Sequence, residues 1–195
     1  MTRGLELFKA QLQAILAQRA GLRLHDPTLI PAAVLIPLLI KNREWHVLVT
    51  QRTLNVEHHK GQISFPGGAR EPEDADLQAT ALRETFEEIG IPPEEVEVLG
   101  ALDDFQTISR FAVTPFVGVI PYPFPYCMNS HEVEAVVVPL SFLFEPTHLR
   151  VEFLERDGTL HEVLFWQYGP YTIWGATARI LKSLIDLLPR QVVSG

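Results

Sequence analysis

The chain has 195 residues, with 16 Lys and Arg against 24 Asp and Glu, which gives a formal net charge of −8. This length favours a single domain, and a hydrophobic content of 47% is enough for a buried core. The acidic balance argues against a general nucleic-acid binder, whose binding surface should be basic. A single cysteine excludes an intrachain disulfide framework and a multi-cysteine zinc site. The longest apolar run, residues 29–40, is too short to span a bilayer, so we expect a cytoplasmic protein without membrane or nucleic-acid partners.

Hydrophobic periodicity predicts how the elements follow one another along the chain. An amphipathic helix is expected at about residues 3–20 and an apolar helix at 174–188. Strands are expected at 32–40, 45–52, 96–102, 111–120 and 135–139, and a hairpin at 151–154 and 160–166. Gly67 and Gly68 predict a sharp turn with a close backbone approach. Mixed helices and strands without repeats predict one α/β domain.

A third helix, predicted at residues 76–89 and ended by Gly90, carries the most informative segment. At 100° per residue its carboxylates share an arc of about 100°. These carboxylates are Glu84, Glu87 and Glu88. Leu82, Phe86 and Ile89 fall on the opposite side, where we expect the core contacts. Such an acidic face suits a hard divalent cation with oxygen ligands, and the alternative is a solvated face with an Arg83–Glu87 ion pair.

The segment from Gly68 to Ile91 resembles the Nudix box, Gly-x5-Glu-x7-Arg-Glu-U-x-Glu-Glu-x-Gly-U, in which U is aliphatic. The second half matches at Arg83, Glu84, Glu87, Glu88, Gly90 and Ile91. Thr85 replaces the aliphatic residue. The interval from Gly68 to Arg83 is one residue longer than usual, so the upstream acid stays open among Glu73, Asp74 and Asp76.

This resemblance implies a Nudix-type α/β/α sandwich around a mixed β-sheet, with residues 1–195 as one domain. It also implies hydrolysis of a diphosphate with Mg²⁺ or Mn²⁺ as cofactor. The implied metal ligands are Glu84, Glu87, Glu88 and the Gly68 carbonyl, with Arg83 orienting the carboxylates. The general base stays open among Glu84 and Glu88 in the box and Glu132 and Glu134 further along.

Residues 48–53 and 59–68 are similar to the Nudix subgroup that cleaves coenzyme A, whose motif is Leu-Leu-Thr-x-Arg-Ser/Ala-x3-Arg-x3-Gly-x3-Phe-Pro-Gly-Gly. Glu57 stands at the position of the second motif Arg, and His58 or Lys60 is a candidate to compensate. Trp-Gly-x-Thr-Ala-Arg at 174–179 is a further similarity. Arginine suits bidentate phosphate contact. The implied substrate-binding residues are Arg52, His58, His59, Lys60, Gly67 and Gly68.

The expected reaction is hydrolysis of coenzyme A or a derivative to 3′,5′-ADP and 4′-phosphopantetheine or its acyl form. One alternative is a Nudix pyrophosphatase for another nucleoside diphosphate derivative such as ADP-ribose. The other alternative is a non-catalytic nucleotide-sensing module. The expected partner is therefore a small-molecule diphosphate, and the sequence leaves monomer and homodimer open.

Overall fold

A mixed sheet of eight strands forms the centre of the computed structural model, which describes residues 2–19, 21–52, 61–124, 133–156 and 158–188. The strands of this sheet are β1 (Ile30–Lys41), β2 (Glu44–Arg52), β3 (Ile63–Ser64), β4 (Gly67–Ala69), β5 (Glu97–Ala101), β6 (Phe105–Gln106), β7 (Phe111–Val119) and β8 (Val133–Pro139). A second sheet contains β9 (Leu149–Arg156), β10 (Thr159–Tyr168) and β11 (Tyr171–Trp174). The helices are α1 (Thr2–Ala17), α2 (Leu77–Ile89), α3 (Leu140–Phe144) and α4 (Gly175–Leu187), with short 3-10 turns η1 (Pro93–Glu95) and η2 (Pro146–His148).

The large sheet has the strand order β3-β2-β1-β7-β5, with β4 also paired to β1, β6 to β7 and β8 to β2. The β1–β7 pair is parallel and runs from Ile30 opposite Phe111 to Leu38 opposite Val119. The other pairs are antiparallel. Because β1 and β7 are covered on both faces, their sequences are almost continuously apolar.

Pro37 lies in the middle of the central strand β1, where a missing N–H would normally cost a ladder hydrogen bond. On this edge β1 pairs with β4 at residues 32–34 and with β2 only from Leu38 onward. The Leu35 N–H points to the same edge and donates to the Pro66 carbonyl. Pro37 therefore falls where β1 changes its antiparallel partner, and its missing donor breaks no strand pairing.

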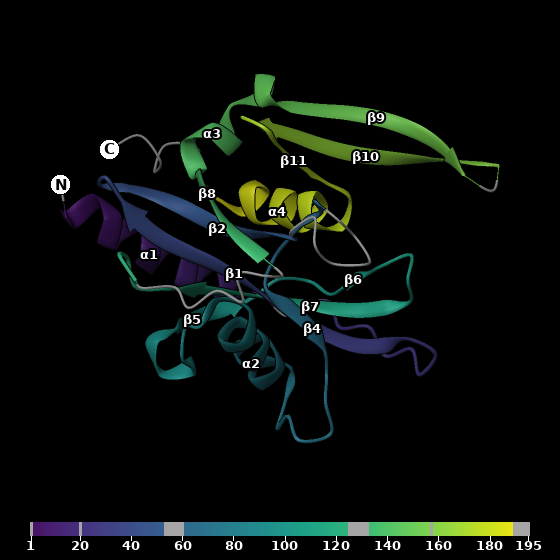
Figure 1. Cartoon of the computed structure of the whole chain (residues 1–195), viewed down its shortest axis with the longest axis horizontal. Coiled ribbons are helices and arrows are strands. Elements are labelled where there is room, and N and C mark those ends of the chain that lie inside the picture. Colours follow the sequence, from purple (N-terminus) through teal and green to yellow (C-terminus); the bar gives the residue numbers. More distant parts are fainter. Residues whose placement is uncertain (1, 20, 53–60, 125–132, 157, 189–195) are drawn as a thin grey trace.

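Helices cover both faces of the large sheet and form two separate cores (Figure 1). On one face, α2 packs through Ile89 onto Leu35, Leu39 and Leu48. On the other face, α1 and α4 share one core with β1, β2 and β8, and Phe8 of α1 lies against Trp45 with ring centroids 5.3 Å apart. Helix α4 lies between the large sheet and the small sheet β9–β11 (Figure 1). This arrangement confirms the predicted single-domain α/β/α sandwich.

Several predicted elements differ from the structure in detail. The first helix ends at Ala17 rather than near residue 20. Gly67 and Gly68 lie in strand β4 rather than in a sharp turn, although the predicted close backbone approach is present. Strands β3, β4, β6 and β11 are too short to show an alternating pattern, so only their tertiary pairing defines them. None of the described helices is long and apolar enough to cross a membrane.

Candidate active site

Helix α2 carries the acidic segment and has well-defined ends. Asp76 caps its N-terminus, and one of its carboxylate oxygens accepts a hydrogen bond of 2.8 Å from the Ala79 N–H. Gly90 ends the helix in the left-handed conformation with φ 76°, and its N–H donates to the Phe86 carbonyl. The helix prediction at 76–89 is confirmed to within one residue.

The buried side of α2 is not the side that its apolar residues predict. Ala81, Thr85 and Ile89 are fully buried, whereas Phe86 is 52% exposed. The centre of the buried side therefore lies about 100° around the helix axis from Glu84 rather than on the opposite side of the helix. The hydroxyl of Thr85 donates to the Ala81 carbonyl at 2.7 Å, so this buried polar group is satisfied within the helix. The prediction that Leu82 and Phe86 face the core opposite the acids is wrong.

This rotation places the three carboxylates in different environments. Glu84 lies at the border of the buried side, with its side chain 18% exposed, whereas the side chain of Glu87 is 55% exposed. Glu88 is half-buried, and its Oε2 atom is buried. Burial raises the pKa of Glu84, and the hydrogen bond from Arg83 opposes this shift. Solvent exposure of the carboxylates thus decreases across the acidic face, from Glu87 on the solvent side to Glu84 at the border of the buried side.

Strand β4 brings Gly68 directly against Glu84. A Cβ atom on Gly68 would lie 2.6 Å from the carboxyl carbon of Glu84 and 2.9 Å from its Oε2, and closer still to Oε1. A Cβ on Gly67 would instead collide with the backbone of Ala33 and Val34 in β1. Gly67 is therefore required for space, whereas a Cβ on Gly68 would displace the Glu84 carboxylate, because the Gly68 backbone and this carboxylate lie side by side.

Arg83 organises the acidic residues around α2. Its Nε and Nη2 donate to the two carboxylate oxygens of Asp74 at 3.0 and 3.1 Å. Its Nη1 donates to Glu84 at 3.0 Å and to Glu87 at 3.3 and 3.4 Å, and Nη2 also reaches the Ala69 carbonyl of β4 at 3.2 Å. One guanidinium thus fixes the loop before α2, strand β4 and two carboxylates.

Asp74 is the acid that pairs with Arg83, and the sequence left it open among three candidates. Its side chain is buried and also accepts hydrogen bonds from the Glu71 N–H and the Thr80 hydroxyl. Hydrogen bonding from Arg83 holds the pKa of Asp74 well below its usual range. Asp76 caps the helix, and Glu73 is exposed. Five residues separate Gly68 from Asp74, as in the usual box, so the additional residue follows Asp74. This spacing is the sequence signal that distinguishes Asp74 from the other two acids.

The donor chemistry of this cluster fits a hard divalent cation, because it offers carboxylate oxygens next to the backbone of β4. In the described part of the chain, no three His, Cys, Asp or Glu side chains converge on one point. Arg83 holds Glu84 and Glu87 through the same nitrogen. Mg²⁺ commonly uses one or two carboxylates together with substrate phosphates, so a partial protein shell is sufficient.

The expected substrate-binding segment is anchored at both of its ends. Arg52 ends β2 opposite Val133 of β8, and the chain returns to β2 where Ile63 pairs with Gln51. Side chains hold this return: Gln51 donates to the Gly61 carbonyl at 3.2 Å, and Thr177 of α4 donates to the Ile63 carbonyl at 2.9 Å. Thr177 belongs to the 174–179 motif, which the structure thereby connects to β3. Glu57, His58, His59, Lys60, Cys127 and Glu132 lie outside the described residues.

Glu134, one of the predicted general bases, lies on the other face of the sheet. On β8, Val136 and Val138 belong to the core with α1 and α4, whereas Ala135 and Val137 pack toward α2. Alternation along the strand places Glu134 with the first group, and its carboxylate accepts a hydrogen bond of 3.4 Å from the Tyr171 hydroxyl of β11. The structure therefore does not bring Glu134 to the carboxylates of α2, because one residue of register decides the face.

Together the fold and the site define a class: an α/β/α sandwich with an arginine-organised carboxylate helix on one face of a mixed sheet. Residues 29–152 match the model of the NUDIX domain. Proteins from Salmonella paratyphi B and Salmonella newport, each named uncharacterized Nudix hydrolase NudL, are 42% identical to the chain over 154 residues, 78% of this chain and 80% of theirs. A solved NUDIX hydrolase from Alicyclobacillus acidocaldarius has a TM-score of 0.54 at 21% identity and covers 86% of this chain and 96% of its own.

The chain belongs to the Nudix hydrolase family, whose members are enzymes that act on pyrophosphate bonds. Nudix hydrolases bind small-molecule diphosphate substrates and generally use divalent metals such as Mg²⁺ or Mn²⁺.

Proposed function

We propose that this Nudix hydrolase cleaves the diphosphate of coenzyme A or its derivatives to 3′,5′-ADP and 4′-phosphopantetheine or its acyl form. The observation that carries the proposal is the course of residues 61–68. This segment is the end of the coenzyme A-type motif: it pairs with β2 through β3 and, within a few residues, reaches Gly68, which lies against Glu84. A substrate bound by the motif would therefore have its diphosphate near the carboxylate helix.

The proposed roles follow from the contacts of each residue. Glu84, Glu87, Glu88 and the Gly68 carbonyl would hold the divalent cation. Arg83 acts as a positioning residue, because its hydrogen bonds fix Glu84 and Glu87 relative to β4. Arg52, with His58, His59, Lys60 and the backbone of Gly67 and Gly68, would bind the substrate phosphates. When bound, Mg²⁺ or Mn²⁺ supplies positive charge that offsets the charge of the diphosphate oxygens during in-line attack by water.

We expect one of the carboxylates near the diphosphate to act as the general base of the proposed reaction. Glu84 and Glu88 are the two candidates on α2, and Glu132 is the candidate on the later loop. Glu134 is a weak candidate, because its carboxylate contacts Tyr171 on the opposite face of the sheet. A base removes a proton from the attacking water and typically contributes about 100-fold or more to the rate.

The test is incubation of the purified protein with coenzyme A and Mg²⁺ or Mn²⁺, followed by chromatographic separation of the products. We expect 3′,5′-ADP and 4′-phosphopantetheine, and a rate at least about 100-fold lower for Glu88→Gln. The matched control is Glu95→Gln, which neutralises an exposed acid of η1 outside the acidic helix. This control should keep the wild-type rate.

The same assay separates the proposed substrate from its alternatives. Turnover of ADP-ribose without turnover of coenzyme A or its thioesters would assign the enzyme to another nucleoside diphosphate derivative. Tight nucleotide binding that is unchanged in Glu88→Gln, without hydrolysis by the wild type, would indicate a sensing module. Cleavage in water enriched in oxygen-18 identifies which phosphorus is attacked, because only the attacked phosphate gains the heavy oxygen.

A further inference from the structure

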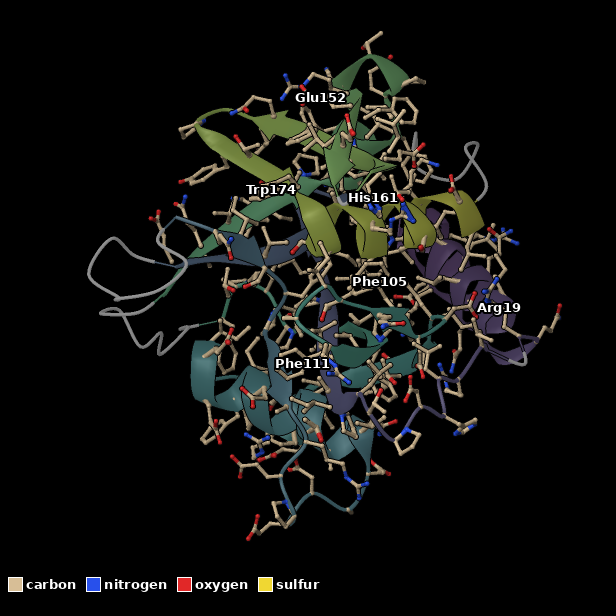
Figure 2. The ribbon with its side chains drawn as sticks, turned by 90° about the vertical axis from the view of Figure 1, so that its right-hand side faces the viewer. Arg19, Phe105, Phe111, Glu152, His161 and Trp174 are labelled. Carbon is tan, nitrogen blue, oxygen red and sulfur yellow. The ribbon has the colours of Figure 1, made fainter. Side chains whose placement is uncertain are left out.

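The β9–β10 hairpin presents an open sheet edge at the end of the molecule that is farthest from α2 (Figures 1 and 2). In the small sheet the strand order is β11-β10-β9, so within the described residues β9 pairs on one side only. Its outer edge is eight residues long and contains no proline. Such an edge exposes backbone donors and acceptors that are able to pair with another strand.

Over residues 149–153, the side chains of β9 divide into an apolar face and a charged face; beyond them, Leu154 lies on the charged face and Glu155 on the apolar one. Leu149, Val151 and Phe153 point to the face of the sheet that contains buried Trp166 and Leu164, since they stand opposite Trp166, Leu164 and Glu162. This apolar row continues beyond the part that α4 covers, because Val151 is 44% and Phe153 64% exposed.

On the other face, Arg150 lies over the Phe165 ring, with 4.8 Å from its guanidinium carbon to the ring centroid. Glu152 lies beside Arg150, and their nearest charged atoms are 2.8 Å apart. The open edge thus combines an apolar row with one adjacent pair of opposite charges.

We propose that β9 pairs antiparallel with β9 of a second copy of this chain, about a two-fold axis that passes through Val151. A two-fold axis that relates adjacent antiparallel strands is perpendicular to the sheet, so each residue pairs with a residue of its own face. In this register Val151 faces Val151 of the partner subunit, and Leu149 faces Phe153 of the partner subunit. On the other face Arg150 stands opposite Glu152 of the partner subunit, twice per dimer.

Charge and apolarity select this register among the neighbouring ones. An axis through Glu152 places two Glu152 carboxylates opposite each other, and like charges directly opposite are destabilising. An axis through Phe153 leaves Val151 opposite the charged Glu155 of the partner subunit. An axis through Leu154 leaves Phe153 opposite Glu155 of the partner subunit. Only the Val151 register among these matches opposite charges on one face and apolar side chains on the other.

The decisive experiment uses two charge reversals on the edge, Arg150→Glu and Glu152→Arg. In either homodimer both cross-strand pairs become repulsive, so we expect dimerisation to weaken by about tenfold or more. Mixing the two variants restores both pairs, because one variant then carries only acids at positions 150 and 152 and the other only arginines. We therefore expect each variant alone to be monomeric at a concentration where the wild type is dimeric, and the equimolar mixture to form a heterodimer.

Sedimentation velocity gives the mass of each sample, and native mass spectrometry with one variant labelled with ¹⁵N identifies the heterodimer. Circular dichroism and thermal melting verify that each variant is folded. A wild type that stays monomeric over the accessible concentration range overturns the proposal. A wild-type dimer whose affinity is unchanged by either reversal also overturns it, because its interface then lies elsewhere.

Discussion

Replacing Gly68 by alanine tests whether the position of the Glu84 carboxylate controls activity. The added Cβ would lie 2.6 Å from the carboxyl carbon of Glu84, whereas an ordinary carbon–carbon contact is about 3.5 to 4.0 Å. The carboxylate therefore has to move by about 1 Å. The colliding atoms are the far end of a flexible side chain, so a change of rotamer relieves the overlap.

The structure predicts a small cost in stability and a large cost in rate for this variant. An off-rotamer side chain costs about 0.5 to 1.5 kcal/mol, and 1 kcal/mol shifts the Tm of a protein of this size by about 2 to 4 °C. A misplacement of about 1 Å at a reacting centre can lower the rate by about 100-fold. We therefore expect a Tm within a few degrees of the wild type and a loss of about 100-fold in kcat.

Two other glycines provide matched controls. A Cβ on Gly67 would lie 2.6 Å from the Val34 Cα, and a strand backbone cannot rotate away as a side chain can. Gly67→Ala should therefore lower the Tm strongly as well as the activity. Gly4 in α1 has open space around its Cβ position, so Gly4→Ala should retain both.

The measurements are thermal melting by circular dichroism and coenzyme A hydrolysis at saturating substrate with Mg²⁺ or Mn²⁺. Full activity in Gly68→Ala would refute the reasoning, because the carboxylate of Glu84 would then tolerate displacement. A Tm loss as large as that of Gly67→Ala would also refute it, since it would mean that the overlap is not relieved by Glu84.

Three further predictions concern the surroundings of the site. Hydrogen bonding from Arg83 lowers the pKa of Asp74 below its ordinary value of 3.8, so ionised Asp74 stabilises the fold at pH values above 3.8. This stabilisation is lost as the pH falls below 3.8. The urea midpoint of the wild type should therefore fall more steeply with acidification than that of Asp74→Asn. Thr177→Val removes the donor to the Ile63 carbonyl and should raise KM for coenzyme A more than it lowers kcat. The same variant should lose about 1 kcal/mol of unfolding free energy in urea. Equal changes in KM and kcat would argue against a positioning role for Thr177. Glu134→Gln should leave kcat within about twofold of the wild type, and a loss of about 100-fold would return Glu134 to the list of candidate bases.

The local chemistry of the sequence determines helix α2 and its chemical character. Asp76 at the start, Gly90 at the end and the helical spacing of three glutamates are short-range signals, and the structure reproduces the predicted ends. The turn between β1 and β2 is also local: it is made by the polar residues Asn42 and Arg43, which both adopt positive φ between the strands expected at 32–40 and 45–52. Capping and turn formation depend on neighbours in the chain, so the sequence by itself specifies them.

Only the tertiary structure decides which residues meet across the sheet. The partner of Arg83 among three nearby acids depends on how the loop before α2 packs, and burial singles out Asp74. The side of α2 that faces the core contains Thr85 and not Phe86. Packing against the strands, rather than the position of the largest apolar side chains on the helix, sets the rotation of α2 about its axis. The face of β8 that carries Glu134 depends on strand register, which no local signal at that residue encodes. These properties arise from contacts between distant segments, and a single sequence contains no direct record of such contacts.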